Sequence, residues 1–592
     1  MSNLFNSVRL TRPSRTKMDL THSVKFSMNA GYITPTSCSL VYPGDSFKTS
    51  SNFTAYLAPL AAPAMADLRA YIHNWRVPLR CIWTHFEDFI TGGEDGTDDS
   101  YLLPRFKYRQ LWDRLVADGK FLSNIEYTST GDQSVDEHNI LALVNNYILS
   151  IFGPGSLFDY LGYPTVQKDF YNFGSSWNWD DFQPSPGETF TITSAVQIDF
   201  NEYPLDPIFN LEMSSLRLRA YAWIYDECYR NPNFEPKLFD KEFYSKSGLE
   251  DGADLEKLSK LRLHRWKLDY FTSALPWPQR GVPSQVPVVG NGSIQSDYLE
   301  FKSHFAPGEE GSTDVKLIYD GSKSYLAPTP GGSPLGIDSD VKIDGLNFTI
   351  NDLRTASALQ RFLERSALGG GRFKEFVYAH FGTIIPDARV QRPEFLGGSR
   401  QGIVISETVQ TSGTDIQGQT TPQGNLAGVG FTSADGNGFK EFFTEHSLIL
   451  QFVYIVPSPS YSQGCSRDLT RFDRYDWYSP EFAHLGEQAI SSKELYANSP
   501  TPNLTFGYAP RFAEYHEIPN SIHGDFKSSM AYWHLGRMFD KTPVLNEDFV
   551  KVHPSDVSRI FAVTDTSVPK FYCCLTNFVS AVRPMPKFAT PI

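Results

Sequence analysis

The sequence predicts a large, mainly β protein in which one antiparallel β-sandwich carries long connections between its strands. Aromatic residues make up 14% of the 592-residue chain, and 43 glycines and 39 prolines supply turns. This composition favours strands joined by long loops. The clearest strand patterns lie near the two ends of the chain, with helical and loop-like stretches between them. The sequence contains neither an obvious interdomain linker nor a repeat of fixed period.

The charge of the chain restricts how it can contact nucleic acid. The chain has 53 Lys and Arg residues against 67 Asp and Glu residues, a formal net charge of −14. A chain of this charge is not a general binder of polyanions, so such contact requires a local basic patch. We expect residues 1–20 to form a basic arm, with a frayed terminus as the alternative. Its candidate nucleic-acid contacts are Arg9, Arg12, Arg15 and Lys17.

The cysteines and the apolar stretches predict a soluble protein made in a reducing cytoplasm. Six cysteines without a C-x-x-C motif are too few for a disulfide scaffold, so we expect free thiols. Met1–Lys17 has no apolar segment of the kind found in signal peptides. The longest apolar stretch, Leu448–Val456, is far shorter than a membrane span, so no membrane insertion is expected.

The first part of the chain is predicted to form strands followed by a mixed, partly helical insertion. In Ser23–Asn29 apolar residues alternate with polar ones, the period of a half-buried strand. Residues 85–180 are mixed, and within them apolar residues recur at helical spacing from Ile140 to Ile151, with Asp136 as the expected N-cap and Gly153 as the stop. Similar alternation predicts strands over Phe53–Leu57, Tyr71–Leu79 and Phe190–Phe200.

The middle of the chain combines helices with one long insertion. We expect a helix over Leu216–Tyr229 that ends at Asn231-Pro232, because proline cannot continue a helix. Residues 284–345 are rich in Gly, Ser, Pro and Asp, which predicts a long exposed loop insertion. Two further helices are expected on either side of a Gly369–Gly371 break, over Asn351–Leu363 and Phe373–His380.

The last part of the chain is predicted to form a second loop followed by strands. Residues 400–440 are rich in Gly, Thr and Gln and are expected to form a loop. The apolar runs that follow predict strands over His446–Val456, Arg559–Val563 and Phe571–Val582.

No catalytic constellation is visible in the sequence. It contains no P-loop, no H-E-x-x-H, no G-x-S-x-G and no Cys/His cluster with zinc spacing. We therefore expect no catalytic, cofactor-binding or metal-binding residues and no enzyme activity. Tryptophans in the first half of the chain and paired acids leave open a carbohydrate-active or carbohydrate-binding β-sandwich protein, such as a lectin-like adhesin. The pairs are Glu87-Asp88, Glu94-Asp95, Asp98-Asp99, Asp180-Asp181 and Glu309-Glu310.

Several long strings resemble the major capsid protein of the Microviridae, most closely its gokushovirus-like branch. Their order and spacing agree with that family from about residue 18 to the C-terminus. They are Leu216–Tyr221, Asp226–Asn231, Asp269–Gly281, His380–Gly382, Pro386–Gly398, Gly424–Gly428, Phe443–His446, Phe482–Gln488, Phe506–Tyr508 and Arg583–Pro586.

The resemblance implies a fold and a function. The fold would be an eight-stranded antiparallel jelly-roll β-barrel over residues 21–592, a single capsid domain with large helical and loop insertions between its strands. The function would be self-assembly, sixty copies at a time, into a small T=1 icosahedral shell around circular single-stranded DNA. Residues 284–345 would build a protrusion at each three-fold axis and are a candidate for host contact.

The resemblance also implies partners and a location. The partners would be other copies of the chain, packaged single-stranded DNA, a small basic DNA-binding protein and other minor virion proteins, and an unknown host surface receptor. The protein would be located in the virion and be assembled in the bacterial host cytoplasm.

Overall fold

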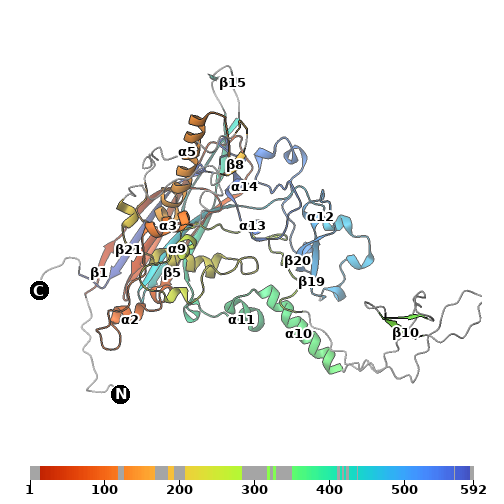
Figure 1. Ribbon diagram of the computed structural model, residues 1–592, viewed down its shortest axis with the longest axis horizontal. Helices are drawn as coiled ribbons and strands as arrows, with labels where there is room; N and C mark the ends of the chain where they lie inside the picture. Colours follow the sequence, from red (N-terminus) through yellow and green to blue (C-terminus); the bar gives the residue numbers. More distant parts are fainter. Residues whose placement is uncertain are drawn as a thin grey trace, which may run out of the picture. The chain divides into compact units, whose positions relative to one another are not determined.

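Figure 1 shows a computed structural model of the chain, which divides into two compact units. One unit comprises Met1–Pro278 and Ala367–Ile592, and the other comprises Gln279–Ser366. The structure describes residues 14–117, 126–166, 185–187, 189–191, 207–282, 316–319, 324–327, 350–409, 414–416, 419–421, 426–436, 438–483, 485–565 and 567–586.

Seven strands form the larger sheet of the first unit, and they come from the start of the chain, from its last strand and from residues 404–442. Strand β21 (Phe571–Arg583) lies between β1 (Thr16–Asp19) and β2 (His22–Met28) on one side and β4 (Ser46–Leu57) on the other. All of these pairs are antiparallel. The sheet continues beyond β4 with β16 (Leu426–Gly436), β13 (Val404–Val409) and β17 (Lys440–Phe442). The first strands of the chain and its last strand therefore belong to one sheet.

A four-stranded antiparallel sheet faces the larger one. Its order is β12 (Glu394–Gly402), β5 (Leu68–Pro78), β18 (Ser447–Pro457) and β3 (Thr34–Val41). One core joins the two sheets, because Phe53 and Leu575 of the larger sheet pack in the same cluster as Ile72 and Val453 of the smaller one. The expectation of a mainly antiparallel β protein with helices and loops is confirmed.

Helices cover the other face of the smaller sheet. A second core packs Phe452 and Tyr454 of β18 against Trp83, Tyr221 and Trp266 of the helical region. Every residue of β18 is therefore buried, which explains its unbroken apolar sequence. The elements of this region are α1 (Leu79–Ile82), α2 (Phe86–Thr91), α3 (Tyr108–Ala117), α5 (Gln133–Phe152), α6 (Leu157–Tyr160), α8 (Leu216–Ile224), the π-helix η3 (Tyr225–Tyr229) and α9 (Gly252–Leu258).

The remaining elements of the first unit are short, apart from α11. They are the strand pairs β6 (Arg105–Phe106) with β9 (Met213–Ser214), β7 (Glu126–Thr128) with β8 (Thr189–Thr191), β14 (Thr414–Ile416) with β15 (Gln419–Thr421) and β19 (Glu487–Ser491) with β20 (Thr505–Pro510), and the helices α11 (Phe373–Phe381), α12 (Ser492–Leu495), α13 (Glu547–Val550) and α14 (Pro554–Ser558). Single 3₁₀ turns occupy Pro207–Asn210, Phe243–Ser245, Asp387–Val390, Arg467–Thr470, Arg474–Asp476, Pro480–Phe482, Ala513–Tyr515, Gly524–Lys527 and Ala531–Trp533.

The second unit contains the hairpin β10 (Lys316–Tyr319) and β11 (Ser324–Ala327) and most of helix α10 (Ile350–Gly369). The break between α10 and α11 falls at Gly370, whose φ of +102° favours glycine. A Cβ atom there would also lie 2.3 Å from the Glu375 carboxylate. The predicted helix break is confirmed.

Of the other predicted elements, some are confirmed and some lie outside the described residues. Strands β2, β4, β5, β18 and β21 and the helix that ends before Asn231-Pro232 are confirmed. Most of the strand predicted over Phe190–Phe200 and most of the 284–345 insertion lie outside the described residues.

Three local predictions are wrong. The loop predicted over residues 400–440 is in large part strand, since β13 and β16 pair along it. The strand predicted over Arg559–Val563 is a turn after α14, with a single bridge between Phe561 and Leu60. Asp136 is not the N-cap of α5, which begins at Gln133; its carboxylate instead accepts hydrogen bonds from the Ser129 and Thr130 side chains.

Candidate assembly and nucleic-acid surfaces

The base of the predicted basic arm lies at an edge of the larger sheet. Of its four candidate side chains, Arg15 and Lys17 are described, whereas Arg9 and Arg12 lie outside the described residues. Lys17 is the register partner of Val582 on β21. The guanidinium carbon of Arg15 lies 5.4 Å from the ring centroid of Phe442. Both basic side chains are exposed.

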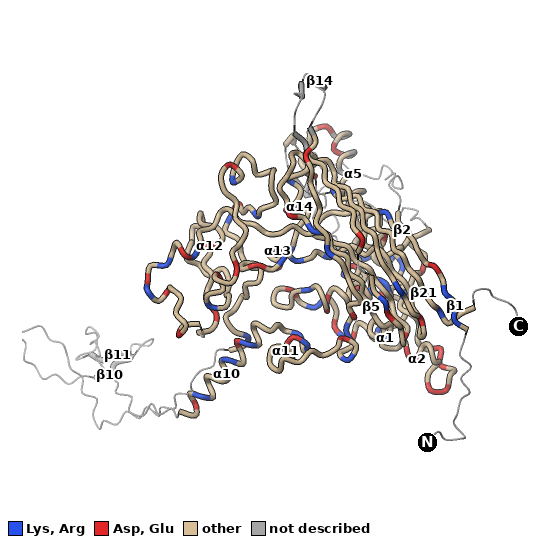
Figure 2. The backbone as a smooth tube through the Cα atoms, turned by 180° about the vertical axis from the view of Figure 1, so that it is seen from behind, with Lys and Arg blue, Asp and Glu red and all other residues tan. Residues whose placement is uncertain are grey.

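Further lysines share a face of the larger sheet with Lys17. This face points away from the smaller sheet, because its residues alternate with core residues such as Phe47, Leu575 and Ala581. We call it the open face. Figure 2 shows basic positions in blue along the strands of this sheet. Its charged side chains on the paired strands are Lys17, Lys25, Lys48 and Lys440 against Asp19 and Asp435.

Two of these lysines face each other directly. Lys48 on β4 and Lys440 on β17 are register partners, and both are exposed. Like charges opposite each other across strands are destabilising. Within the described part of the chain, neither is in an ion pair with an acid. A bound polyanion would relieve the repulsion, so this part of the open face favours an anionic partner.

A second surface gathers exposed aromatic side chains around an arginine. The Arg471 guanidinium donates to the Glu514 carboxylate at 2.6 Å and lies 4.6 Å from the Tyr515 ring centroid and 5.9 Å from that of Trp477. Tyr478 packs edge-on against Tyr515 at 6.1 Å. We call this set the Arg471 patch, made of Arg471, Phe472, Tyr475, Trp477, Tyr478, Tyr515 and Ile518.

The Arg471 patch has the composition of a protein interface. Phe472 and Ile518 are 90% and 91% exposed, so they contribute almost nothing to the core of the subunit. Aromatic residues are enriched where proteins bind each other. The Arg471 side chain is itself only 5% exposed and contacts the rings of Tyr515 and Trp477. Large apolar side chains that stay exposed in this way indicate an interaction site.

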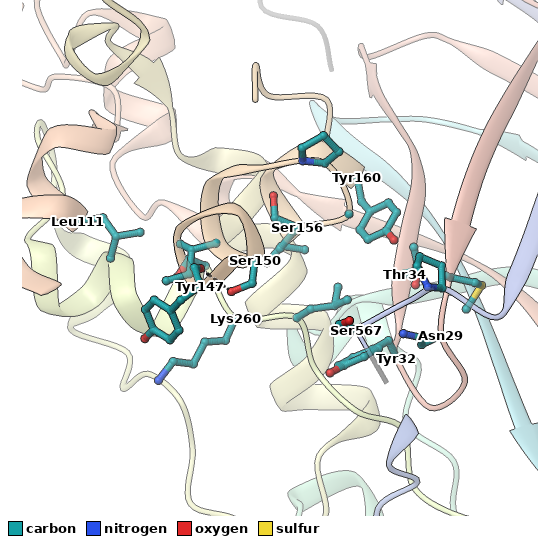
Figure 3. Close-up of a pocket in the computed structure, with 18 of the residues that line it drawn as sticks. Asn29, Tyr32, Thr34, Leu111, Tyr147, Ser150, Ser156, Tyr160, Lys260 and Ser567 are labelled. Carbon is teal, nitrogen blue, oxygen red and sulfur yellow. Dashed lines mark hydrogen bonds between the residues drawn. The ribbon is translucent and has the colours of Figure 1, made fainter. Parts of the chain in front are cut away.

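One cavity of about 620 Å³ is lined by residues from the smaller sheet, α3, α5, α6 and α9. Figure 3 shows Tyr32, Tyr147 and Tyr160 around it. Among the described residues that line it, Glu256 is the sole carboxylate, and its Oε1 atom lies 3.1 Å from Lys260 Nζ. Glycoside hydrolysis uses two convergent carboxyl groups, so this cavity does not offer that chemistry.

Three of the tryptophans that left a carbohydrate-active protein open pack within the subunit. Trp83 and Trp112 are buried in the core, and Trp75 Nε1 donates to the Tyr229 hydroxyl at 2.9 Å. Trp177 and Trp179 lie outside the described residues, as do Asp180-Asp181 and Glu309-Glu310. Across the described ranges, no group of three or more His, Cys, Asp or Glu side chains is arranged to hold a metal ion, and no helix is long and apolar enough to cross a membrane.

Comparison with known proteins decides between these interpretations. The profile of the family described as "Capsid protein (F protein)" matches residues 6–110 and 184–592. The chain belongs to this family. Residues 111–183, which include α5, lie outside the match. The resemblance to Microviridae capsid proteins is thereby confirmed, and a carbohydrate-active protein is not favoured.

Relatives along the whole chain agree with the family. The chain is 27% identical to capsid protein VP1 of Chlamydia phage 1, an alignment that covers 100% of this chain and 98% of the relative. It is 28% identical to capsid protein VP1 of Bdellovibrio phage phiMH2K, with 99% and 97% covered. It is 26% identical to capsid protein VP1 of Spiroplasma virus 4, with 98% and 95% covered.

Sequence reasoning missed most of the two surfaces. Lys25 and Lys48 occupy polar positions of alternating strands, which was a usable signal. Lys440 lies in the segment interpreted as a loop. The Arg471 patch is built from two segments more than 30 residues apart, Arg471–Tyr478 and Tyr515–Ile518, and neither has a strand or helix period to mark it.

Proposed function

We propose that this capsid protein assembles, sixty copies at a time, into a T=1 icosahedral shell that encloses circular single-stranded DNA, and that it has no enzyme activity. The main support for this proposal is sequence similarity to three phage capsid proteins along the whole chain. The protein would be part of the virion and be assembled in the bacterial host cytoplasm, together with a small basic DNA-binding protein and other minor virion proteins. Negative-stain electron microscopy of the expressed chain tests this, since monodisperse monomers of about 67 kDa would contradict it.

We infer an eight-stranded jelly roll from the pairing of the long strands. Eight long strands carry this inference. Four of them lie in the larger sheet and four in the smaller one, and the chain crosses repeatedly between the two sheets. Their order is β2–β21–β4–β16 in one sheet and β3–β18–β5–β12 in the other. A jelly roll combines two Greek keys in two facing sheets, and this order supports it. Residues 21–592 would then be one capsid domain with insertions.

The insertions would face away from the DNA. In the first unit, helices cover the smaller sheet, whereas the larger sheet keeps its open face. The proposed interior is therefore the open face, with the basic arm at its edge. The 284–345 insertion lies within the separate unit Gln279–Ser366, which supports its proposed role as a protrusion at the three-fold axis that contacts the host.

Deleting residues 1–17 is expected to reduce packaged DNA more than it reduces the solubility of the subunit. The deletion removes Arg9, Arg12, Arg15 and Lys17. The salt slope of single-strand binding should also become shallower by about 0.7 for each phosphate that these side chains no longer bind. The ratio of absorbance at 260 and 280 nm of purified particles measures the packaged DNA. Particles that package the full genome without the arm would contradict this role.

Introducing charge into the Arg471 patch is expected to abolish shell formation without unfolding the subunit. The variant Phe472→Asp with Ile518→Asp changes two side chains that are almost fully exposed. The melting temperature of the subunit should therefore equal that of the parent chain. Each apolar side chain buried at an interface contributes about 1.5–3 kcal/mol. The variant Phe472→Leu with Ile518→Leu is the matched control and should still assemble. Normal shells from the aspartate variant, counted by electron microscopy, would exclude the patch as an interface.

A further inference from the structure

A row of aromatic side chains crosses the open face at right angles to its strands. Tyr572 on β21 and Tyr56 on β4 are register partners, and Tyr56 is in turn the partner of Phe431 on β16. Neighbouring strands lie about 4.8 Å apart, so three successive partners form a continuous line. The ring centroids of Tyr56 and Phe431 are 5.1 Å apart. We call these three residues the aromatic row.

The aromatic row does not contribute to the protein core. Tyr572, Tyr56 and Phe431 are 47%, 55% and 42% exposed, whereas their chain neighbours Ala55 and Cys573 are buried. Cross-strand aromatic contacts contribute to sheet stability, but this contribution does not explain why three large rings remain exposed to solvent. Exposed apolar surface of this kind indicates contact with another molecule.

A positive charge and hydroxyl groups lie beside the aromatic row. One step along the face, Lys25 on β2 pairs with Cys574, which pairs with Thr54. The Thr54 hydroxyl lies 3.4 Å from that of Ser433. A nucleotide presents a flat base, a sugar and a negative phosphate, and this part of the open face offers a ring, hydroxyls and a cation to match them.

We propose that the aromatic row is a stacking platform for the unpaired bases of single-stranded DNA, with the phosphates held by Lys25 and by the facing pair Lys48 and Lys440. This inference rests on the proposed function, because it names where the packaged strand contacts the shell. The excess of lysines on the open face complements a polyanion and would repel a basic protein. Rings accept the face of every base, so binding is independent of sequence.

Duplex DNA is the poorer ligand for this platform. Its bases are already stacked on one another and present only their edges in the grooves. The lysines still attract its phosphates, but the three rings have no base face to contact. The structure therefore predicts a preference for single strands that resides in the rings, and a salt dependence that resides in the lysines.

Binding of the full chain to a fluorescent oligothymidine strand, compared with a duplex of the same length, tests the platform. Replacing Tyr56, Tyr572 or Phe431 by leucine should weaken single-strand binding about tenfold for each ring removed and leave duplex binding and the salt slope unchanged. The variants Tyr56→Phe, Tyr572→Phe and Phe431→Tyr keep a ring and should bind as the parent does. Val429→Ala, on β16 of the same face, is the matched control.

A second measurement needs no variant. Ultraviolet cross-linking of a strand carrying 5-bromodeoxyuridine to the unmodified chain, followed by mass spectrometry, should label peptides that contain the aromatic row. Leucine variants that bind single strands like the parent, or cross-links confined to other peptides, would overturn the platform. Leucine variants that bind DNA normally but lose assembly would show that the row is instead a contact between proteins.

The two proposals fail in different ways. If the parent chain forms shells and the aromatic row is irrelevant to DNA binding, the platform is wrong and the shell function stands. If the parent chain forms no shells under conditions in which it is folded, the proposed function fails whatever the binding data show.

Discussion

Replacing Glu250 by glutamine is expected to lower the free energy of unfolding by about 3–5 kcal/mol, because it leaves a buried arginine without its counter-charge. The Arg219 and Glu250 side chains are each 1% exposed, and Arg219 Nε lies 2.6 Å from Glu250 Oε1. The Ser215 hydroxyl donates to the same carboxylate oxygen at 2.5 Å. The arginine also donates to the carbonyl oxygens of Ile82 at 3.3 Å and Lys246 at 3.2 Å.

Urea unfolding of the subunit, followed by tryptophan fluorescence, measures this loss. Trp83 and Trp266 are buried in the same helical core and should report its opening. Changing both partners, Arg219→Met with Glu250→Leu, should recover most of the lost stability, because no unpaired charge remains in the interior.

An exposed ion pair provides the matched control for the buried one. Arg109 Nε lies 2.7 Å from Asp113 Oδ1, but the two side chains are 40% and 53% exposed. Arg109→Ala should therefore cost less than about 0.5 kcal/mol. If Glu250→Gln is as mild as this control, the buried pair does not hold α8 to the segment that precedes α9.

The long strands could be predicted because their surroundings impose a simple pattern. Strand β4 has core on one face and solvent on the other, so its residues alternate. Strand β18 is covered on both faces, so it reads as an unbroken apolar run. The pairing of the N-terminal strands with β21 is not contained in either pattern, because it depends on contacts more than 500 residues apart.

The sequence pattern misleads where a strand contains glycines for a packing reason. In β16, a Cβ atom at Gly428 would lie 2.5 Å from the carbonyl oxygen of Ala62, and one at Gly430 would lie 2.6 Å from the Leu57 side chain. These close approaches require glycine within a strand, whereas a prediction from composition alone assigns a glycine-rich segment to a loop. The opposite error occurs at Arg559–Val563, where an apolar run forms a turn after α14 and makes only one bridge, from Phe561 to Leu60.

The candidate surfaces could be predicted only in part. The basic arm is visible as a local excess of charge, whereas the face to which Lys25 or Lys48 points depends on which side of the sheet is covered. The aromatic row joins three strands from distant parts of the chain, and its members are ordinary strand residues until the register places them side by side. Each candidate surface is built by the fold from distant segments, which one short motif cannot encode.

Acid is expected to destabilise the subunit through His73, which the fold keeps neutral. His73 lies on β5, its Nδ1 atom is 2.8 Å from the Tyr229 hydroxyl, and its Nε2 atom is 3.2 Å from the Tyr454 hydroxyl. The Phe395 ring lies 5.2 Å away, edge to face. Burial among these rings lowers the pKa of His73 to about 4, because the charged imidazolium is poorly solvated there.

The direction of the pH effect follows from comparing the two states. An unfolded histidine has a pKa of about 6.5, so the unfolded chain binds a proton below that pH while the folded chain does not. The free energy of unfolding should therefore fall as pH decreases from about 6.5 to about 4, by about 3 kcal/mol from this group, and should show no contribution from it above pH 7. Buried or half-buried carboxyl groups whose pKa is raised by burial act in the opposite direction, namely Asp226, Glu394, Glu494 and Asp556.

The variant His73→Gln separates the histidine from these carboxyl groups, because it retains a hydrogen-bonding side chain and removes the titration. The ring contacts that it also loses, such as that with Phe395, lower the stability of the variant equally at every pH. Urea midpoints of parent and variant should converge as the pH falls from about 6.5 to about 4, since the parent loses stability there that the variant has no imidazole to lose. Parallel curves over this range would mean that His73 is charged in the folded protein or is not shielded by Tyr229, Tyr454 and Phe395, and the layer between β5 and the helices would then be open to water.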